Sequence, residues 1–178
     1  LTGAILLDVD LSSANLDGTI LRGADLTGAI LLDVDLSSAN LDGTILRGVD
    51  LTGASLLGVD LSDRDLSGAT LGIDLSGKNL DGTILRGADL TGASLLGVDL
   101  SILDLTNANL SGQNLSDHDL TDVILTGADL SNTLLSDSLD RKDFTETKFR
   151  GVDLSGKDLS NSIFDCIINT ATIRCNNF

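Results

Sequence analysis

The sequence predicts an all-β solenoid in which the chain turns a corner at every repeat and closes a square coil with four five-residue repeats. Three features predict this fold. A central Leu, replaced in places by Ile or Phe, recurs at every fifth residue along the chain. A small or β-branched residue stands two positions before most of these centres. An Asp or Asn directly precedes many of them, and a Ser or Thr often follows.

The centres form one series from end to end. They run from Leu1 to Leu71, resume at Leu75 and continue to Leu135. A third run starts at Leu139, and the series is completed by Ile168, Ile173 and Phe178. Three steps, at 71–75, 135–139 and 164–168, are one residue short. We count each short step as a full repeat, so that later centres keep their place in the coil.

Neither regular element accommodates a period of five. On an α-helix each step of five residues rotates by about 140°, which would spread the Leu side chains around the axis. On a straight strand an odd period would place successive Leu on opposite faces. If the chain bends at every repeat, each Leu points to the axis and each small residue packs inward beside a corner. The many Gly suit corner positions that need unusual φ values.

The repeats resemble the pentapeptide-repeat family, whose pattern is A(D/N)LXX. Two matching stretches are Ala24-Asp25-Leu26-Thr27-Gly28 and Ala108-Asn109-Leu110-Ser111-Gly112. The resemblance covers essentially the whole chain, so we expect residues 1–178 to form a single solenoid. It implies a right-handed quadrilateral parallel β-helix. About nine coils of four pentapeptides, at about 4.8 Å per coil, would make a rod about 44 Å long.

Charge divides the chain into two parts. The net charge is −16, and residues 1–138 hold 21 acidic and 5 basic residues, whereas residues 139–178 hold 6 of each. The C-terminal end is therefore charge-balanced, and it contains all four Phe. The acidic part disfavours direct binding to nucleic acid or to an anionic membrane. Neither a signal peptide nor a transmembrane segment is visible and the sequence has no Met, so no localisation is predicted.

An internal duplication argues against an active site. Residues 1–25 and 26–50 differ only at Ala24 and Val49. An offset of five repeats would put the same sequence on an adjacent side of the square, where a localised site would not survive. A square rod has no cleft, and the only His is His118. We therefore expect no enzyme activity, no cofactor, no metal and no small-molecule substrate.

The Asp residues have two interpretations. Fifteen of the 26 directly precede a centre, where the ordinary role is to satisfy a turn at the surface. The resemblance implies another role, because some family members bind type II topoisomerases with a surface that imitates DNA, and some confer fluoroquinolone resistance. The candidate positions for such a surface are Asp25, Asp35, Asp50 and Asp60.

Apolar residues at outward positions are the other candidate for a partner surface. Leu57 and Leu96 stand where Ser or Thr is usual. Five Ile stand where Asp or Asn is usual, and we expect these to spread over several sides: Ile5, Ile20, Ile30, Ile45 and Ile84.

The favoured function is a rigid structural rod that binds another protein or itself. The terminal coils show no covering helix, and solenoid ends with open strand edges recruit other strands. An acidic first coil and a last part with Lys148, Arg150, Lys157 and Arg174 predict end-to-end association as a filament or dimer. The alternative is the acidic DNA mimic that binds gyrase.

One more column is predicted at the inward position two before the centre. Counting four repeats per coil aligns Lys78, Val98, His118, Asp137 and Lys157. We expect Asp137 to pair with both cationic neighbours, either partly buried or with side chains that reach water through the corner. Cys166 and Cys175 are expected as free thiols or core residues, and a disulfide requires that the last coil depart from the square.

Overall fold

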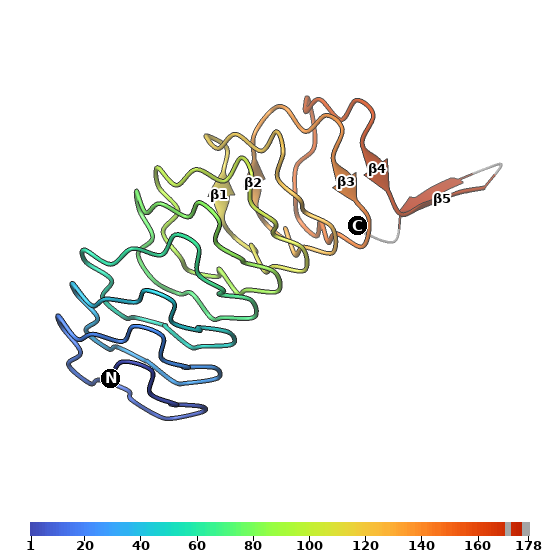
Figure 1. The fold of residues 1–178 in the computed structure, drawn as a ribbon. Helices are drawn as coiled ribbons and strands as arrows, with labels where there is room; N and C mark the ends of the chain where they lie inside the picture. The colour runs from blue at the N-terminus through green and yellow to red at the C-terminus, as the bar shows by residue number, and fades with distance from the viewer. Residues whose placement is uncertain (170–171, 176–178) are drawn as a thin grey trace.

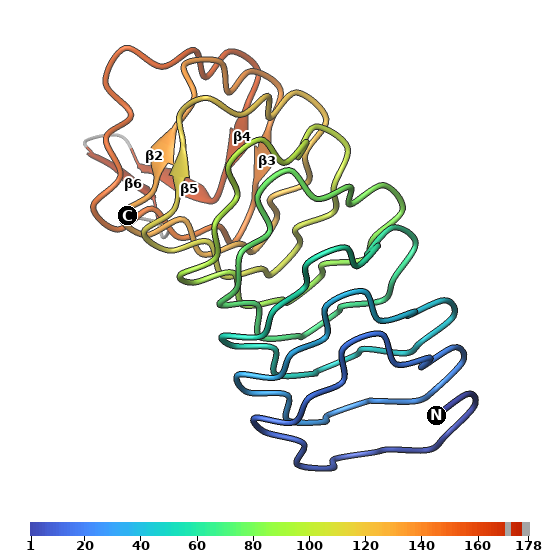
Figure 2. The same cartoon turned by 90° about the vertical axis from the view of Figure 1, so that its left-hand side faces the viewer.

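The computed structural model describes residues 1–169 and 172–175, with side chains up to residue 165. The chain winds as stacked four-sided coils around one axis, from the N-terminus at one end to the C-terminal part at the other (Figures 1 and 2). Adjacent coils are joined in parallel, and many of the residues before a centre pair with their equivalent one coil later. Ile5 pairs with Asp25, and Asp25 pairs in turn with Ile45. The register step is 20 residues, as four five-residue repeats per coil predict.

Regular strands are short because the chain is straight only between two corners. β1 (Asn114–Leu115) pairs with β2 (Leu134–Leu135), and β3 (Asp143–Phe144) pairs with β4 (Ile163–Phe164), both in parallel. Elsewhere along the coils the pairing is reduced to isolated bridges. The fold is thus a parallel β-helix in which only one or two residues of each side pair with the next coil.

A coil that contains a short step has one residue fewer but still has four sides. Across the step at 71–75, Asp65 pairs with Ile84, and across the step at 135–139, Asp129 pairs with Lys148. Both register steps are 19 residues. At the first step the Ile73 N–H donates to the Leu71 carbonyl over 2.7 Å, which is the bond of a three-residue γ-turn and replaces the longer corner.

The other corners are mostly type II turns. The Ala29 N–H donates to the Leu26 carbonyl over 2.9 Å, and Gly28 between them has φ +68°. A type II turn requires positive φ at this position, which favours Gly and is tolerated by Asn or Asp. Asn107, with φ +60°, fills the same position in another coil. The Gly spacing in the sequence therefore reflects the corners.

The centres build an apolar axial core. Leu26, Leu46, Leu66 and Leu85 are all buried, as predicted for centres that follow one another on one side. In the C-terminal coils the core becomes aromatic. The ring of Phe144 lies 5.0 Å from that of Phe149 and 5.1 Å from that of Phe164, measured between centroids. Phe144 and Phe164 are register partners, so their rings lie one above the other in adjacent coils.

The last part of the predicted series is wrong. The chain leaves the coil after Phe164 and forms an antiparallel hairpin of β5 (Cys166–Asn169) and β6 (Thr172–Cys175), which extends beyond the last coil (Figure 1). Ile168 and Ile173 face each other across this hairpin rather than continuing the repeat. The segment has no Gly for a corner and is rich in β-branched residues, which favour extended strands.

Cys166 is the register partner of Cys175 in the same hairpin. The end of the chain therefore departs from the square, which was the stated condition for a disulfide. The side chains of both Cys, and the whole of Phe178, lie outside the described residues.

Candidate interaction surface

Each coil has four sides, which we number by their central residues. Side 1 contains Leu21, side 2 Leu26, side 3 Leu31 and side 4 Leu36. The residue before each centre points outward, and its equivalents in successive coils form one column along each side. The outer surface of the rod is therefore a set of columns with a spacing of about 4.8 Å.

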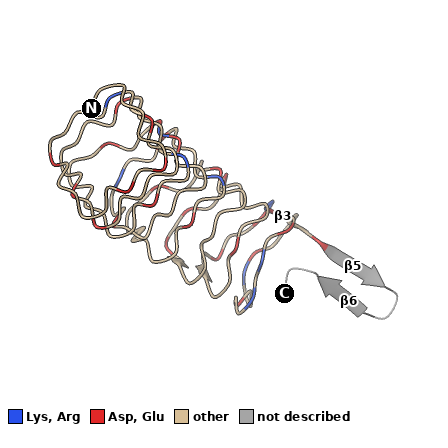
Figure 3. Cartoon of the chain, turned by 90° about the horizontal axis from the view of Figure 1, so that it is seen from below, with Lys and Arg blue, Asp and Glu red and all other residues tan. Residues whose placement is uncertain are grey.

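The four candidate Asp lie on four different sides. Asp60 is on side 1, Asp25 on side 2, Asp50 on side 3 and Asp35 on side 4, as their positions before successive centres require. Acidic residues accordingly occur all around the rod rather than on one face (Figure 3). These positions form no local patch, and any acidic surface is a property of the whole rod.

Each of these carboxylates also takes part in a corner. Oδ1 of Asp25 accepts the Thr27 backbone N–H over 3.0 Å, and Oδ1 of Asp60 accepts that of Ser62 over 2.9 Å. The Thr27 hydroxyl, followed by its N–H, lowers the pKa of Asp25 below the usual value, and Ser37 acts in the same way on Asp35. For Asp60 the N–H of Ser62 is the main cause of the lowered pKa. These carboxylates thus cap turns, and the same hydrogen bonds favour the ionised forms of Asp25, Asp35 and Asp60.

Leu57 and Leu96 lie on one side. Both belong to side 4, directly after a centre and two coils apart, with Ser76 between them. Their exposed fractions are 76% and 78%. Their column therefore carries two projecting Leu side chains separated by a small polar residue.

The exposed Ile residues are less scattered than the sequence analysis expected. Ile20 lies on side 1 and Ile30 on side 3, but Ile5, Ile45 and Ile84 all lie on side 2. That column also contains Ile124 and Ile163, which were not among the predicted outward Ile. The count of sides that aligns the inward column of His118 reveals this grouping when it is applied to the outward position before each centre.

Polar residues at the inward position follow a common rule. Most of them donate to the carbonyl of a central residue in the coil below and one side back; Lys142, which donates to Thr121, is an exception. Thr44 Oγ1 donates to Leu21 over 2.9 Å, and Lys78 Nζ donates to Leu56 over 2.6 Å. The carbonyl oxygens of the centres thus satisfy side chains that would otherwise be unpaired in the core.

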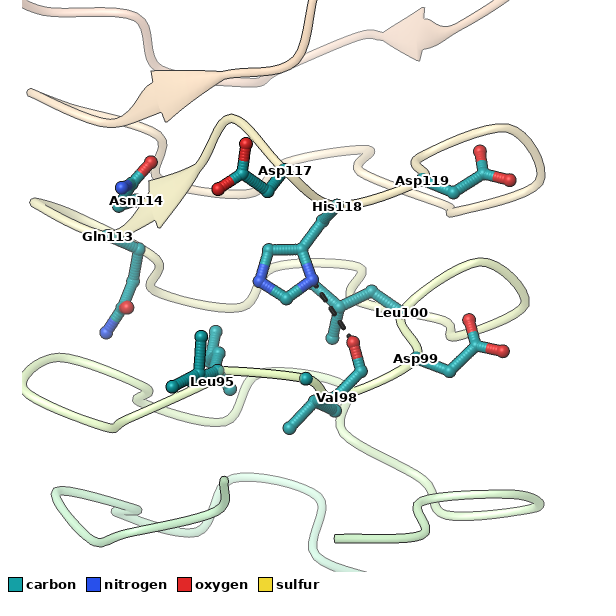
Figure 4. A pocket seen from close by; sticks show the side chains of 11 residues that line it. Leu95, Val98, Asp99, Leu100, Gln113, Asn114, Asp117, His118 and Asp119 are labelled. Atoms are coloured by element: carbon teal, nitrogen blue, oxygen red, sulfur yellow. Dashed lines mark hydrogen bonds between the residues drawn. The ribbon is translucent and has the colours of Figure 1, made fainter. Parts of the chain in front are cut away.

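The predicted column ends in an ion pair. Lys157 Nζ lies 2.9 Å from Asp137 Oδ1, and the Lys side chain is 16% exposed whereas that of Asp137 is 96% exposed. The hydrogen bond and the charge of Lys157 lower the pKa of Asp137. Nδ1 of His118 instead donates to the Val98 carbonyl in the coil below over 3.1 Å (Figure 4). The Lys stem is therefore buried while its ammonium meets the carboxylate at the surface.

A cavity of about 520 Å³ opens beside His118, at the corner of sides 4 and 1 (Figure 4). Leu95, Val98 and Gln113 line it together with Asp residues. Gln113 Nε2 donates to the carbonyls of Leu90 and Ala93 over 2.6 and 3.1 Å. The amide and the imidazole are thus both bonded to backbone, and no nucleophile is paired with a base among the lining residues. Within residues 1–169 and 172–175, no group of three or more His, Cys, Asp or Glu could hold a metal ion.

In the described part of the chain no helix is long and apolar enough to cross a membrane.

Comparison with known proteins agrees with this architecture. The family model described as pentapeptide repeats matches in eight copies over residues 1–33, 29–68, 72–101, 104–139 and 138–165. No curated protein matches the chain in sequence.

Solved structures with the same fold include HetL from the cyanobacterium Nostoc sp. strain PCC 7120, a pentapeptide repeat protein involved in the regulation of heterocyst differentiation. It has a TM-score of 0.53 at 25% identity, and the alignment covers 89% of this chain and 88% of HetL. QnrB1, a plasmid-mediated fluoroquinolone resistance protein, matches with a TM-score of 0.42 at 19% identity over 90% of this chain and 93% of QnrB1. The five-residue period of the sequence, the four-sided coils and the family match together show that the chain belongs to the pentapeptide-repeat family.

Proposed function

We propose that the protein is a non-enzymatic β-solenoid rod whose surface binds protein, either another chain or a second copy of itself. The observation that carries this proposal is the set of large apolar side chains at outward positions. Leu57 and Leu96 contribute nothing to the axial core, yet they are more than three-quarters exposed. Because both project from one column, two coils apart, they offer a partner two apolar contact points on the same side.

The rod geometry supports a repetitive contact. Each outward column repeats at about 4.8 Å, fixed by the parallel pairing between coils. Solenoids use such extended, regular surfaces to bind their partners. A partner with its own repeat could therefore make the same contact several times.

End-to-end association as a filament or dimer is one form of this function. The acidic N-terminal coils would face Lys148, Arg150 and Lys157 of the next molecule, and a head-to-tail contact that does not close makes a filament. The β5–β6 hairpin extends beyond the last coil, so such a contact would involve this hairpin as well as the coil edge.

Site-specific photo-crosslinking in the native host tests the proposal. A photoreactive amino acid replaces Leu57 or Leu96 in the full chain, and the matched controls carry it at Ser37 or Ser116 in the same column. We expect protein adducts from the Leu positions and few from the Ser positions. Equal labelling at all four positions, or no adduct with any protein including itself, would contradict a defined binding surface.

A second candidate is the acidic mimic of DNA that binds a type II topoisomerase. The distribution of carboxylates over all four sides supports it, as phosphates surround a duplex. The charge is about −2.3 per coil in residues 1–138, compared with about −2.8 for duplex DNA over the same length. If this candidate is right, the protein inhibits gyrase supercoiling at micromolar concentration and salt weakens the inhibition.

The matched variant for this test replaces Asp25, Asp35, Asp50 and Asp60 by Asn. Asn keeps the acceptor that caps each turn and removes the charge, so the fold is preserved. Unchanged supercoiling with the parent protein would retire this candidate.

A further inference from the structure

Side 2 carries a regular ladder of two residue types. At the outward position before each centre, Ile and Asp alternate without interruption through the described coils. This Ile–Asp ladder consists of Ile5, Asp25, Ile45, Asp65, Ile84, Asp104, Ile124, Asp143 and Ile163. β-bridges join many of its neighbours, for example Asp65 with Ile84 and Asp104 with Ile124.

The alternation is a property of the folded rod. In sequence the Ile residues are separated alternately by 40 and 39 residues, because a short step lies in every second interval. The ladder nevertheless stays in phase, since each short step still occupies one side. In the described coils, the other three sides each carry one large apolar residue at this position, namely Ile20, Ile30 and Leu134. The ladder is therefore not a general feature of the repeat.

The two residue types give the ladder relief. Ile45, Ile84 and Ile124 are 41%, 43% and 47% exposed and stand out from the side. The Asp carboxylates bend back toward their corners, as when Asp25 accepts the Thr27 N–H over 3.0 Å and its hydroxyl over 2.6 Å. Asp25, Asp65 and Asp104 are less exposed than the Ile on either side of them, so each forms a shallow hollow between two Ile knobs. The knobs repeat every two coils, or about 9.6 Å.

Arginines reduce the negative charge of the ladder at its middle. Arg47 Nε lies 3.3 Å from Asp65 Oδ2, and the Arg86 guanidinium lies 2.7 Å from Asp104 Oδ2. Each Arg stands two residues after an Ile of the ladder, and its side chain extends to the Asp of the ladder in the next coil. This matters for a chain of net charge −16, because it removes much of the repulsion that another acidic surface would meet here.

The period of the knobs selects the occupant. An α-helix repeats its contacts every seven residues, about 10.5 Å, and would fall out of step with the ladder by several ångströms over its length. A second copy of this chain has the same period at every knob. Resting on the protein-binding function proposed above, we infer that the Ile–Asp ladder is a self-association face, on which two rods pack side 2 against side 2.

The relief also fixes the arrangement of the two rods. A twofold axis parallel to the rods would place each Ile against the same Ile of its partner and leave the hollows empty. A twofold axis perpendicular to the rods makes them antiparallel and permits a shift of one coil. The Ile of each copy then fill the hollows over the Asp of the other, in a closed isologous dimer.

The size of the face is compatible with a dimer. From Ile5 to Ile163 the ladder spans eight coil-to-coil steps, about 38 Å. A standard interface buries about 800 Å² on each partner, so a strip of this length must be about 20 Å wide. The contact therefore includes the corners beside the ladder, where Arg47 and Arg86 lie.

Sedimentation equilibrium of the full chain tests this inference. The variant carries Ile45→Asp and Ile84→Asp, which place at both positions the residue that the family pattern favours, so the coils are expected to fold. We expect the parent to form dimers and the double variant to have a dissociation constant roughly 100-fold higher or more. Because both copies are acidic, raising NaCl from about 0.15 M to about 0.5 M should strengthen the parent dimer.

The matched control carries Ile20→Asp and Ile30→Asp, the same chemical change on sides 1 and 3, and should dimerise like the parent. Small-angle X-ray scattering provides a second readout, since lateral packing leaves the maximum dimension close to that of one rod. A parent that stays monomeric at millimolar concentration in high salt, equal loss of dimer in both variants, or a doubled maximum dimension would each overturn the inference. A monomeric parent that still gives specific adducts at Leu57 would overturn it while leaving the proposed function intact.

Discussion

At the residue scale, inward polar side chains are tolerated because the backbone offers them a fixed partner. Thr147 is buried, and its hydroxyl donates to the Leu125 carbonyl over 2.8 Å. The same carbonyl accepts the Ala128 N–H over 3.0 Å, so it remains bonded when the hydroxyl is lost. Thr147→Val should therefore lower the free energy of unfolding by only about 1 kcal/mol. Urea denaturation measures the change, and a loss above about 3 kcal/mol would mean that the hydroxyl has a larger role.

The corner Asp residues predict a pH dependence of stability. The folded-state pKa of Asp25 and of Asp35 lies below the usual value of 3.8. Their ionised forms therefore stabilise the fold above about pH 4, and this contribution is lost as the pH falls through the folded-state pKa. An Asp25→Asn, Asp35→Asn variant lacks this titration. Thermal melting should show that the parent loses stability relative to the variant between about pH 4 and pH 2.

A constant difference between the two proteins across this pH range would show that the hydrogen bonds from Thr27 and Ser37 do not favour the ionised carboxylates.

At the element scale, the sequence predicts the coil well because each local feature depends on one position of the repeat: the core on the central residue and the corner on the residue two positions after it. The centres, the corners and the two short steps at 71–75 and 135–139 all follow from spacing. The hairpin at Cys166–Cys175 was missed because Ile168 and Ile173 keep the period of five although they belong to paired extended strands. The Ile–Asp ladder was missed because the count of sides was applied to the inward column of His118 and not to the outward position before each centre.

An inward and an outward Leu predict effects of different size for the same substitution. Leu66 is buried in the axial core, whereas Leu57 is mostly exposed. Leu66→Asp should destabilise the rod by at least about 3 kcal/mol, because it removes a buried Leu and introduces an unpaired charge. Leu57→Asp should leave the melting temperature within a few degrees of the parent. Similar melting temperatures for the two variants would refute the assignment of inward positions.

The turn geometry at Gly112 predicts how substitutions there change the stability of the rod. Its φ is +75°, and a Cβ there would meet only open space. Gly112→Ala should cost about 1 kcal/mol, because Ala disfavours the left-handed region even where there is room. Gly112→Asn should cost less, as Asn107 occupies the equivalent corner one repeat earlier with φ +60°. Chemical denaturation of both variants gives the order, and a more stable Ala variant would contradict the turn assignment.

At the scale of the whole molecule, charge opposes compactness along most of the rod. The 27 acidic residues outnumber the 11 basic ones, and the coils carry carboxylates on all four sides of the rod. Added salt should therefore raise the melting temperature, because it screens repulsion between coils. A scanning calorimetry series in NaCl measures this effect, with sucrose as a control for non-ionic stabilisation. A melting temperature that falls with salt would imply that ion pairs such as Arg86–Asp104 outweigh the repulsion.

The short step has a consequence for how such a chain can change without losing its surface. The side on which a residue lies is set by the number of corners before it in the chain, not by the number of residues. Losing one residue at a corner leaves every later side chain on its original side. Losing or gaining a whole repeat turns all that follows by a quarter of a circle. A one-residue deletion at a corner therefore leaves the composition of each side unchanged. Insertion of five repeats instead places a copied sequence on an adjacent side, as residues 26–50 repeat residues 1–25 one side further on.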